Sequence, residues 1–188
     1  MTTKKTEKKP EKSDAGNEPS FEKALERLEK IVSEMESGAL SLECLSRGAS
    51  SVMCIEKSHR HVEFIRSNAV AAGYGEILET RTQDVFPAMR QLAENGAQFD
   101  LILADPPYGE KNVNRRSESF AQQLLDDPHL PKLLAPGGRL VLGHTKRDTL
   151  EFVPPWAEFK TLKHGDTLMR FLEIKASSTD IQAPEKFQ

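Results

Sequence analysis

The sequence predicts an α/β fold, in which a mostly parallel sheet carries helices on both of its faces. From residue 41 onward, short apolar runs alternate with segments whose apolar residues recur at helical spacing, and this alternation is typical of such folds. The run Phe99–Ala104 is apolar except for Asp100, as expected for a strand covered on both faces. At 188 residues the chain has room for one such domain and an appendage.

The N-terminal part of the chain differs from the rest. Residues 1–19 contain almost no apolar side chains, so we expect a disordered tail. Ser20 can then cap a helix, and the apolar residues that follow it recur at helical spacing. These features predict an amphipathic helix over residues 20–36, whose apolar stripe must pack on the remaining chain or on a partner. The α/β domain is expected over residues 37–175, followed by a loose tail at 176–188.

Hydrophobic periodicity and turn residues predict the elements of the α/β domain. Helices are expected at 58–72, 87–93 and 120–134, the last with interruptions at Pro128 and Pro131. Strands are expected at 52–55, 77–82, 99–104, 140–142, 159–162 and 168–174. Pro136-Gly137-Gly138 predicts a tight turn before the fourth strand, and Gly165-Asp166 predicts the turn of a hairpin formed by the last two.

Composition excludes several classes of protein. The formal net charge is -3, so there is no global basic signature for nucleic acid, and any RNA contact must come from a local patch. Cys44 and Cys54 stand in apolar surroundings, outside any metal-ligand spacing with His59 or His61, so we expect buried free thiols and no metal. No apolar run approaches the ~20 residues of a membrane span, and no secretory signal precedes the domain. We therefore expect a cytoplasmic protein.

Three acidic residues follow predicted strands. These residues are Glu56, Asp84 and Asp105. In an open parallel sheet, ligands bind outside the carboxyl ends of the strands. An acid at the place of Glu56 is suited to a pair of ribose hydroxyls, and Asp84 could accept a hydrogen bond from an adenine amine. Acids at strand ends also occur as solvated or helix-capping groups, so neither residue alone identifies a site.

The segment Asp105-Pro106-Pro107-Tyr108 carries a more specific signal, because it directly follows the apolar strand. Two prolines hold the backbone in a rigid extended turn, which places a carboxylate, a backbone carbonyl and an aromatic ring close together. An exocyclic amine needs two acceptors to orient its lone pair toward a methyl donor, and Asp105 and the Pro106 carbonyl can supply them. Tyr108 can stack on a base that has left its helix.

A cationic segment comes directly after this turn. Lys111, Arg115 and Arg116 are expected on a loop above the same site, where they could contact RNA phosphates. Charge runs of this kind are also common on solvated surfaces, so the sequence leaves both interpretations open.

Residues 37–173 resemble a family of bacterial 16S rRNA guanine-N2 methyltransferases, the RsmD family. The matching stretches are residues 37–40, 45–49, 55–57, 83–86, 101–109, 133–139 and 164–167. The resemblance implies a class I, Rossmann-like fold, S-adenosylmethionine as methyl donor, and 16S rRNA or a small-subunit assembly particle as substrate of a monomer. It also implies that Ser37, Gly38, Glu56, Asp84 and Asp105 contact the cofactor, and that the turn from Asp105 to Tyr108, with both prolines, contacts the target base. An adenine- or protein-glutamine-directed enzyme is disfavoured by the stretches 45–49 and 165–167.

A second resemblance covers residues 20–43. This stretch is similar to the first helix of the exonuclease VII small subunit, and the resemblance implies a helix-mediated contact with an exonuclease large subunit. A generic Glu/Lys-rich helix is the alternative. The chain could accordingly be an interaction protein that is not a catalyst.

The two resemblances overlap at residues 37–43. In a methyltransferase, the first strand and the glycine loop should lie just before this point of the chain. Glu36 stands in place of the first glycine of that loop. We therefore expect a sheet that lacks its first, central strand and leaves neighbouring edges unpaired. Loss of the glycine also removes a close backbone approach to the cofactor, so we predict weaker binding of S-adenosylmethionine than in an intact family member.

Overall fold

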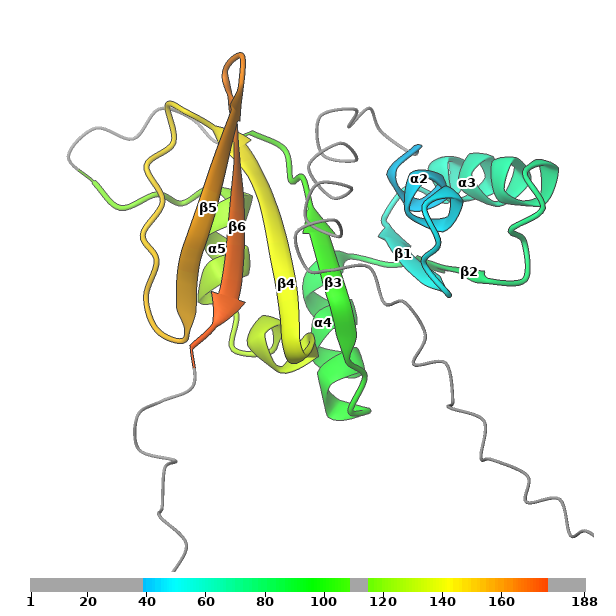
Figure 1. Cartoon of the computed structure of the whole chain (residues 1–188), viewed down its shortest axis with the longest axis horizontal. Helices are drawn as coiled ribbons and strands as arrows, with labels where there is room; N and C mark the ends of the chain where they lie inside the picture. The colour runs from blue at the N-terminus through cyan, green and yellow to red at the C-terminus, as the bar shows by residue number, and fades with distance from the viewer. Residues whose placement is uncertain (1–38, 109–114, 176–188) are drawn as a thin grey trace, which may run out of the picture.

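The computed structural model describes residues 39–108 and 115–175 (Figure 1). In chain order the elements are α2 (Ala39–Ser46), β1 (Val52–Glu56), α3 (His59–Ala71), β2 (Leu78–Thr82), α4 (Val85–Glu94), β3 (Phe99–Ala104), α5 (Phe120–Asp126), the 3₁₀ helix η1 (Leu130–Leu133), β4 (Leu134–Thr145), β5 (Trp156–His164) and β6 (Thr167–Ile174). The expectations for the tail 1–19, the helix 20–36 and the tail 176–188 lie outside these residues, as do Ser37, Gly38 and Lys111.

The strands form two sheets. β1 and β2 pair in parallel, and a four-stranded sheet has the order β3-β4-β6-β5. Within it β3 and β4 are parallel, whereas β4–β6 and β5–β6 are antiparallel. The expectation of parallel pairing is correct for β1–β2 and β3–β4, and the hairpin expected for the last two strands is the antiparallel β5–β6 pair. The antiparallel β4–β6 pair was not predicted; the hairpin joins the sheet through β6, which runs opposite to β4.

In the part of the chain that the structure describes, the parallel strands β1, β2 and β3 each have one unpaired edge. The sequence predicts unpaired edges at a missing central strand, and the residues at that point of the chain lie outside the described ranges. Helix α4 connects the two sheets instead, because its Met89 and Leu92 belong to the core against which Met53 and Ile55 of β1 also pack. Figure 1 shows β1, β2, α2 and α3 grouped beside β3.

Residues alternate between two cores along β4. Leu140 and Leu142 face the larger core, which includes α4, α5 and η1, whereas Val141 faces a smaller cluster with Met169 and Phe171 of β6. This alternation follows from the two-residue period of a strand. Both clusters exclude solvent from β4. The half of this strand from Leu140 to Thr145 is therefore buried throughout.

One sequence expectation is met and one fails near the start of β4. The helical stretch expected at 120–134, with interruptions at Pro128 and Pro131, consists of α5 and η1. Pro128 lies in the break between them, where its ring and missing backbone donor oppose a continuous helix. Pro136-Gly137-Gly138 lies inside β4 and is not a turn before it. One residue between Phe99 and Leu101 faces four between Leu134 and Arg139, so the extra residues form a bulge.

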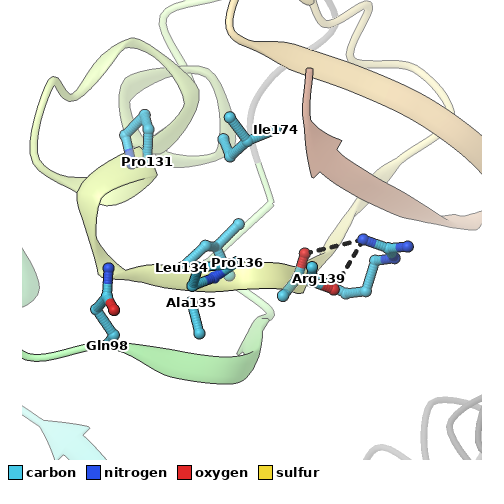
Figure 2. A pocket seen from close by; sticks show the side chains of 9 residues that line it. Gln98, Pro131, Leu134, Ala135, Pro136, Arg139 and Ile174 are labelled. Carbon is cyan, nitrogen blue, oxygen red and sulfur yellow. Dashed lines mark hydrogen bonds between the residues drawn. The ribbon is translucent and has the colours of Figure 1, made fainter. Parts of the chain in front are cut away.

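The Arg139 side chain stabilises the bulge. The Arg139 guanidinium donates to the carbonyl oxygens of Gly137 and Gly138 at 2.9 and 3.2 Å (Figure 2). Gly137 has a φ of +79°, a conformation that favours glycine. No helix among the described residues is long and apolar enough to cross a membrane.

Candidate active site

Three strands end in the acids that the sequence singled out. Glu56 is the last residue of β1, Asp84 follows β2 and caps α4, and Asp105 follows β3. The structure also brings β4 and β6 to the turn that begins at Asp105, which the sequence did not predict. The candidate site therefore has two parts, one at β1 and β2 and one at β3, β4 and β6.

Each acid of the first part uses carboxylate oxygens in local contacts. Glu56 Oε1 accepts from the backbone N–H of Ser58 at 2.7 Å. Asp84 Oδ1 accepts from the N–H of Phe86 at 3.2 Å, and Asp84 Oδ2 lies 3.4 Å from Lys57 Nζ. Asp84 is therefore a helix cap as well as a candidate acceptor, and a ligand amine would share it with Lys57.

Asp105 opens the second part. The carboxylate lies against Gly143 of β4, because a Cβ built on Gly143 would overlap Asp105 Oδ1, while lying 3.2 Å from Met169 Sδ of β6. The register explains this contact, since Ala104 pairs with Leu142 one residue earlier. Although the residue as a whole is exposed, partial burial of the carboxyl raises the pKa of Asp105 above its ordinary value.

Tyr108 is the last residue of the turn, and its side chain is anchored through the phenol hydroxyl. Its phenol oxygen shares a hydrogen bond of 2.8 Å with Oγ1 of Thr167, the first residue of β6. The side chain is nevertheless 58% exposed. The ring is therefore held by its hydroxyl while much of its surface stays open to a planar ligand.

The tip of the β5–β6 hairpin carries several cations next to Thr167. Asp166 forms an ion pair with Lys146 and lies 3.9 Å from Arg147, and the Lys146 cation lowers the pKa of Asp166. Lys163 also acts on Asp166 electrostatically. Three cations around one carboxylate leave a local positive excess in a chain with net negative charge.

The predicted RNA-binding arginines have different surroundings. Arg116 donates to both oxygens of Asp126 at 2.6 and 2.8 Å and to Glu151 at 3.0 Å. These two carboxylates raise the pKa of Arg116 and hold its guanidinium on the protein. Arg115 is exposed at the edge of the described residues and has a contact of its own.

A pocket of about 340 Å³ lies elsewhere on the molecule. It is lined by Gln98, Pro131, Leu134, Ala135, Pro136, Gly137, Gly138, Arg139 and Ile174 (Figure 2). Gln98 precedes β3 and Leu134 begins β4, so this pocket is at the amino ends of these strands. Ligands of open α/β sheets bind at the opposite ends, where Asp105 and Tyr108 lie.

Sequence reasoning missed two residues that hold this site in place. Gly143 carries no local signal, because its importance depends on the strand beside it. Thr167 belongs to a stretch matched by the family resemblance, but nothing in the sequence links it to Tyr108. The register between strands would have been needed to find either residue.

Comparison with known proteins identifies a family and relatives of this chain. The family model described as conserved hypothetical protein 95 matches residues 35–173, and the model of the exonuclease VII small subunit matches residues 21–47. The chain is 30% identical over 115 residues to ribosomal RNA large subunit methyltransferase K/L of Methylococcus capsulatus, covering 59% of this chain and 15% of that protein. The chain thus spans less than a fifth of that relative.

Solved structures show the same fold. A proposed methylase of Haemophilus influenzae superposes with a TM-score of 0.58 at 20% identity, over 82% of this chain and 98% of that chain. SMU.776, a proposed methyltransferase complexed with SAH, gives a TM-score of 0.56 at 12% identity, over 73% of this chain and 43% of that chain. The predicted class I methyltransferase fold is therefore confirmed.

Proposed function

This chain belongs to the family of conserved hypothetical protein 95, and from that premise we propose that it transfers a methyl group from S-adenosylmethionine to the exocyclic N2 of a guanine in ribosomal RNA. The more specific proposal is a guanine of the small-subunit 16S rRNA, either free or in an assembly particle, acted on by a monomer. The Methylococcus relative is named for the large subunit. The assay must therefore decide which ribosomal subunit is modified.

The turn from Asp105 to Tyr108 is the observation that carries the proposal. Asp105 accepts a hydrogen bond from one N–H of the guanine amine and the Pro106 carbonyl accepts from the other, which directs the nitrogen lone pair. The Tyr108 ring, exposed but held by Thr167, stacks on the base. The carboxylate also stabilises the positive charge that develops on the nitrogen, and such fixed electrostatic groups contribute strongly to catalysis.

The residues at β1 and β2 fit the nucleoside part of S-adenosylmethionine. Glu56 ends β1 and Asp84 follows the paired strand β2, where their carboxylates can accept from ribose hydroxyls and an adenine amine. The bound cofactor would supply an electrophilic methyl group on a sulfonium. Glu36, Ser37 and Gly38 lie outside the described residues, so the contacts at the methionine end stay a prediction, as does the weakened affinity.

Cations near the turn support an RNA substrate. Lys146, Arg147 and Lys163 surround Asp166 at the hairpin tip, and Thr167 connects that tip to Tyr108. Phosphates beside a stacked base would meet this positive excess. Arg115 and Lys111 stay candidates for the same role, while Arg116 would first have to leave Asp126 and Glu151.

A methyl-transfer assay tests the proposal. Undermethylated small and large ribosomal subunits, and their isolated rRNAs, are incubated with the protein and labelled S-adenosylmethionine, and the product is mapped by mass spectrometry. We expect N2-methylguanine in 16S rRNA, and none with Asp105→Ala. Product in 23S rRNA alone would overturn the small-subunit assignment, and no product in any RNA would overturn the enzymatic one.

A second function is favoured by the match of residues 21–47 to the exonuclease VII small subunit. In that function the chain binds an exonuclease large subunit without catalysis. The matched part that the structure describes belongs to α2, whose Leu45 is buried with Ile65 and Ala69 of α3. This part of the match is therefore packed within the methyltransferase fold. Co-purification with an exonuclease VII large subunit, lost on deletion of residues 20–36, would support the second function.

A further inference from the structure

We propose that Gly143 of β4 and Thr167 of β6 are positioning residues, which together set where the Asp105 carboxylate and the Tyr108 ring meet the target base. The inference rests on the proposed function of the turn, but its geometry does not depend on which ribosomal subunit is the substrate. Neither residue touches the substrate in this proposal, and each acts through one side chain of the turn.

Gly143 acts by leaving space. Asp105 Oδ1 occupies the volume that a Cβ on residue 143 would fill, and Met169 Sδ bounds the same space at 3.2 Å. The backbone of Gly143 has no left-handed φ, so its role is steric. A methyl group here would push the carboxylate off β4 and toward solvent, and the acceptor for the amine would move with it.

Thr167 acts by holding the ring. Its Oγ1 is 2.8 Å from the phenol oxygen of Tyr108, and its own place is secured by pairing with Thr145 and His164. The Lys146 N–H adds a 2.8 Å hydrogen bond to the Asp166 carbonyl. Because Thr167 engages the phenol oxygen, the role of Tyr108 in this proposal is to stack its ring on the base.

The two contacts act on the same short segment. Pro106 and Pro107 limit the freedom of the backbone between Asp105 and Tyr108, and both ends rest on neighbouring strands. Gly143 pairs with Met169, and Thr145 pairs with Thr167 two residues along. The β4–β6 register therefore sets the spacing between carboxylate and ring.

A double-mutant cycle tests the Thr167 contact in the full chain. We expect Thr167→Val and Tyr108→Phe each to lower kcat about five- to tenfold. The double variant should be no worse than either single one, because both remove the same hydrogen bond. Thr167→Ser should recover most of the rate, and Thr82→Val, at the exposed end of β2, serves as control. Additive losses, or a Tyr108→Phe effect with Thr167→Val silent, would show that the phenol contacts the substrate and overturn this half.

The Gly143 contact is tested by the pH profile. Gly143→Ala should lower kcat at least tenfold, and the acid limb of the remaining activity should move to lower pH because the displaced carboxylate is better solvated. Gly75→Ala, where a Cβ would meet a Val70 methyl at 3.0 Å, is the matched control. A lower rate with an unmoved acid limb would mean a general loss of structure, and would overturn the positioning role.

Two readouts do not require turnover. The chain contains two tyrosines, so Tyr74→Phe leaves Tyr108 as the single site for 3-fluorotyrosine. Thr167→Val should narrow and shift the fluorine resonance of Tyr108. Gly143→Ala should lower the Asp105 pKa measured by carbon NMR. If methyl transfer fails in the parent chain but these changes occur, the proposed function falls and the positioning inference stands. If the parent is active and neither signal changes, the inference falls alone.

Discussion

The two parts of the site differ in how they are supported. The turn from Asp105 to Tyr108 is held from three strands, β3, β4 and β6, which belong to one four-stranded sheet. Glu56 ends β1 and Asp84 follows β2 in a separate two-stranded sheet, whose side chains reach the main core at Met53 and Ile55 beside α4. Two-stranded sheets are marginal without such packing. We therefore expect the proposed target-base part of the site to be more rigid than the proposed cofactor part.

The largest effect is expected from removing the acceptor at the rigid part. Asp105→Asn should lower methyl transfer about a hundredfold or more, as expected for the loss of one fixed electrostatic group. Affinity for S-adenosylmethionine, measured by calorimetry, should change much less. Asp100→Asn, an exposed acid on the same strand, is the control. Equal losses of cofactor affinity and rate in Asp105→Asn would contradict the separation into two parts.

Unequal stability of the two sheets is the next prediction. Leu140→Ala removes a fully buried side chain from the main core and should lower the free energy of unfolding by about 3 kcal/mol. Leu78→Ala, in β2, should lower it less and mainly raise hydrogen exchange in β1 and β2. Urea unfolding and amide exchange would measure both. Uniform exchange across the two sheets would show that they unfold as one unit.

Cofactor binding should respond to the acids of the small sheet. Glu56→Gln is expected to weaken S-adenosylmethionine binding about tenfold, a typical loss for a hydrogen bond to a charged group. The Tyr108 fluorine signal should not change. Asp84→Ala should in addition lower the free energy of unfolding by about 1 kcal/mol, because it removes the side-chain cap of α4. If calorimetry shows that the parent chain binds S-adenosylmethionine as tightly as an intact family member does, the predicted weak cofactor binding is contradicted.

The salt dependence of RNA affinity should distinguish the cations around Asp166 from Arg116. Lys146→Ala should weaken RNA binding a few-fold and reduce the salt slope by about 0.7 to 0.9, as for one phosphate contact. Arg116→Ala should leave that slope unchanged, because Asp126 and Glu151 already engage the guanidinium. Filter binding over a range of salt concentrations measures both slopes. A lower slope for Arg116→Ala alone would place the RNA on the other side of the turn.

The smallest effect is expected from pH. Burial raises the pKa of Asp105, so the carboxylate is protonated at a higher pH than an ordinary aspartate, near 3.9. The acid limb of kcat should lie above that value. The folded state also binds this proton more tightly than the unfolded chain, so ionisation of Asp105 lowers stability as pH rises through the two pKa values. Asp105→Asn should therefore gain stability relative to the parent between acidic and neutral pH.

Most of the elements were predictable because they depend on local pattern. The strand Phe99–Ala104 has the predicted bounds, and α3 and α4 begin and end within a few residues of expectation. The bulge in β4 was read as a turn, because a Pro-Gly-Gly sequence suits either structure. Only the partner strand β3, with its shifted register, decides between them.

The sequence by itself determined the order of the strands and helices from β1 onward, though not helix α2, and it determined the acids at strand ends. It also led to the proposed chemistry of the Asp-Pro-Pro-Tyr turn. Each of these depends on residues close together in the chain. The tertiary structure alone decided that Gly143 leaves space for Asp105, that Thr167 holds Tyr108, and that Arg116 is engaged by Asp126 and Glu151. These contacts join residues from about 10 to about 60 positions apart. Strand register and packing set them, and no local pattern encodes either.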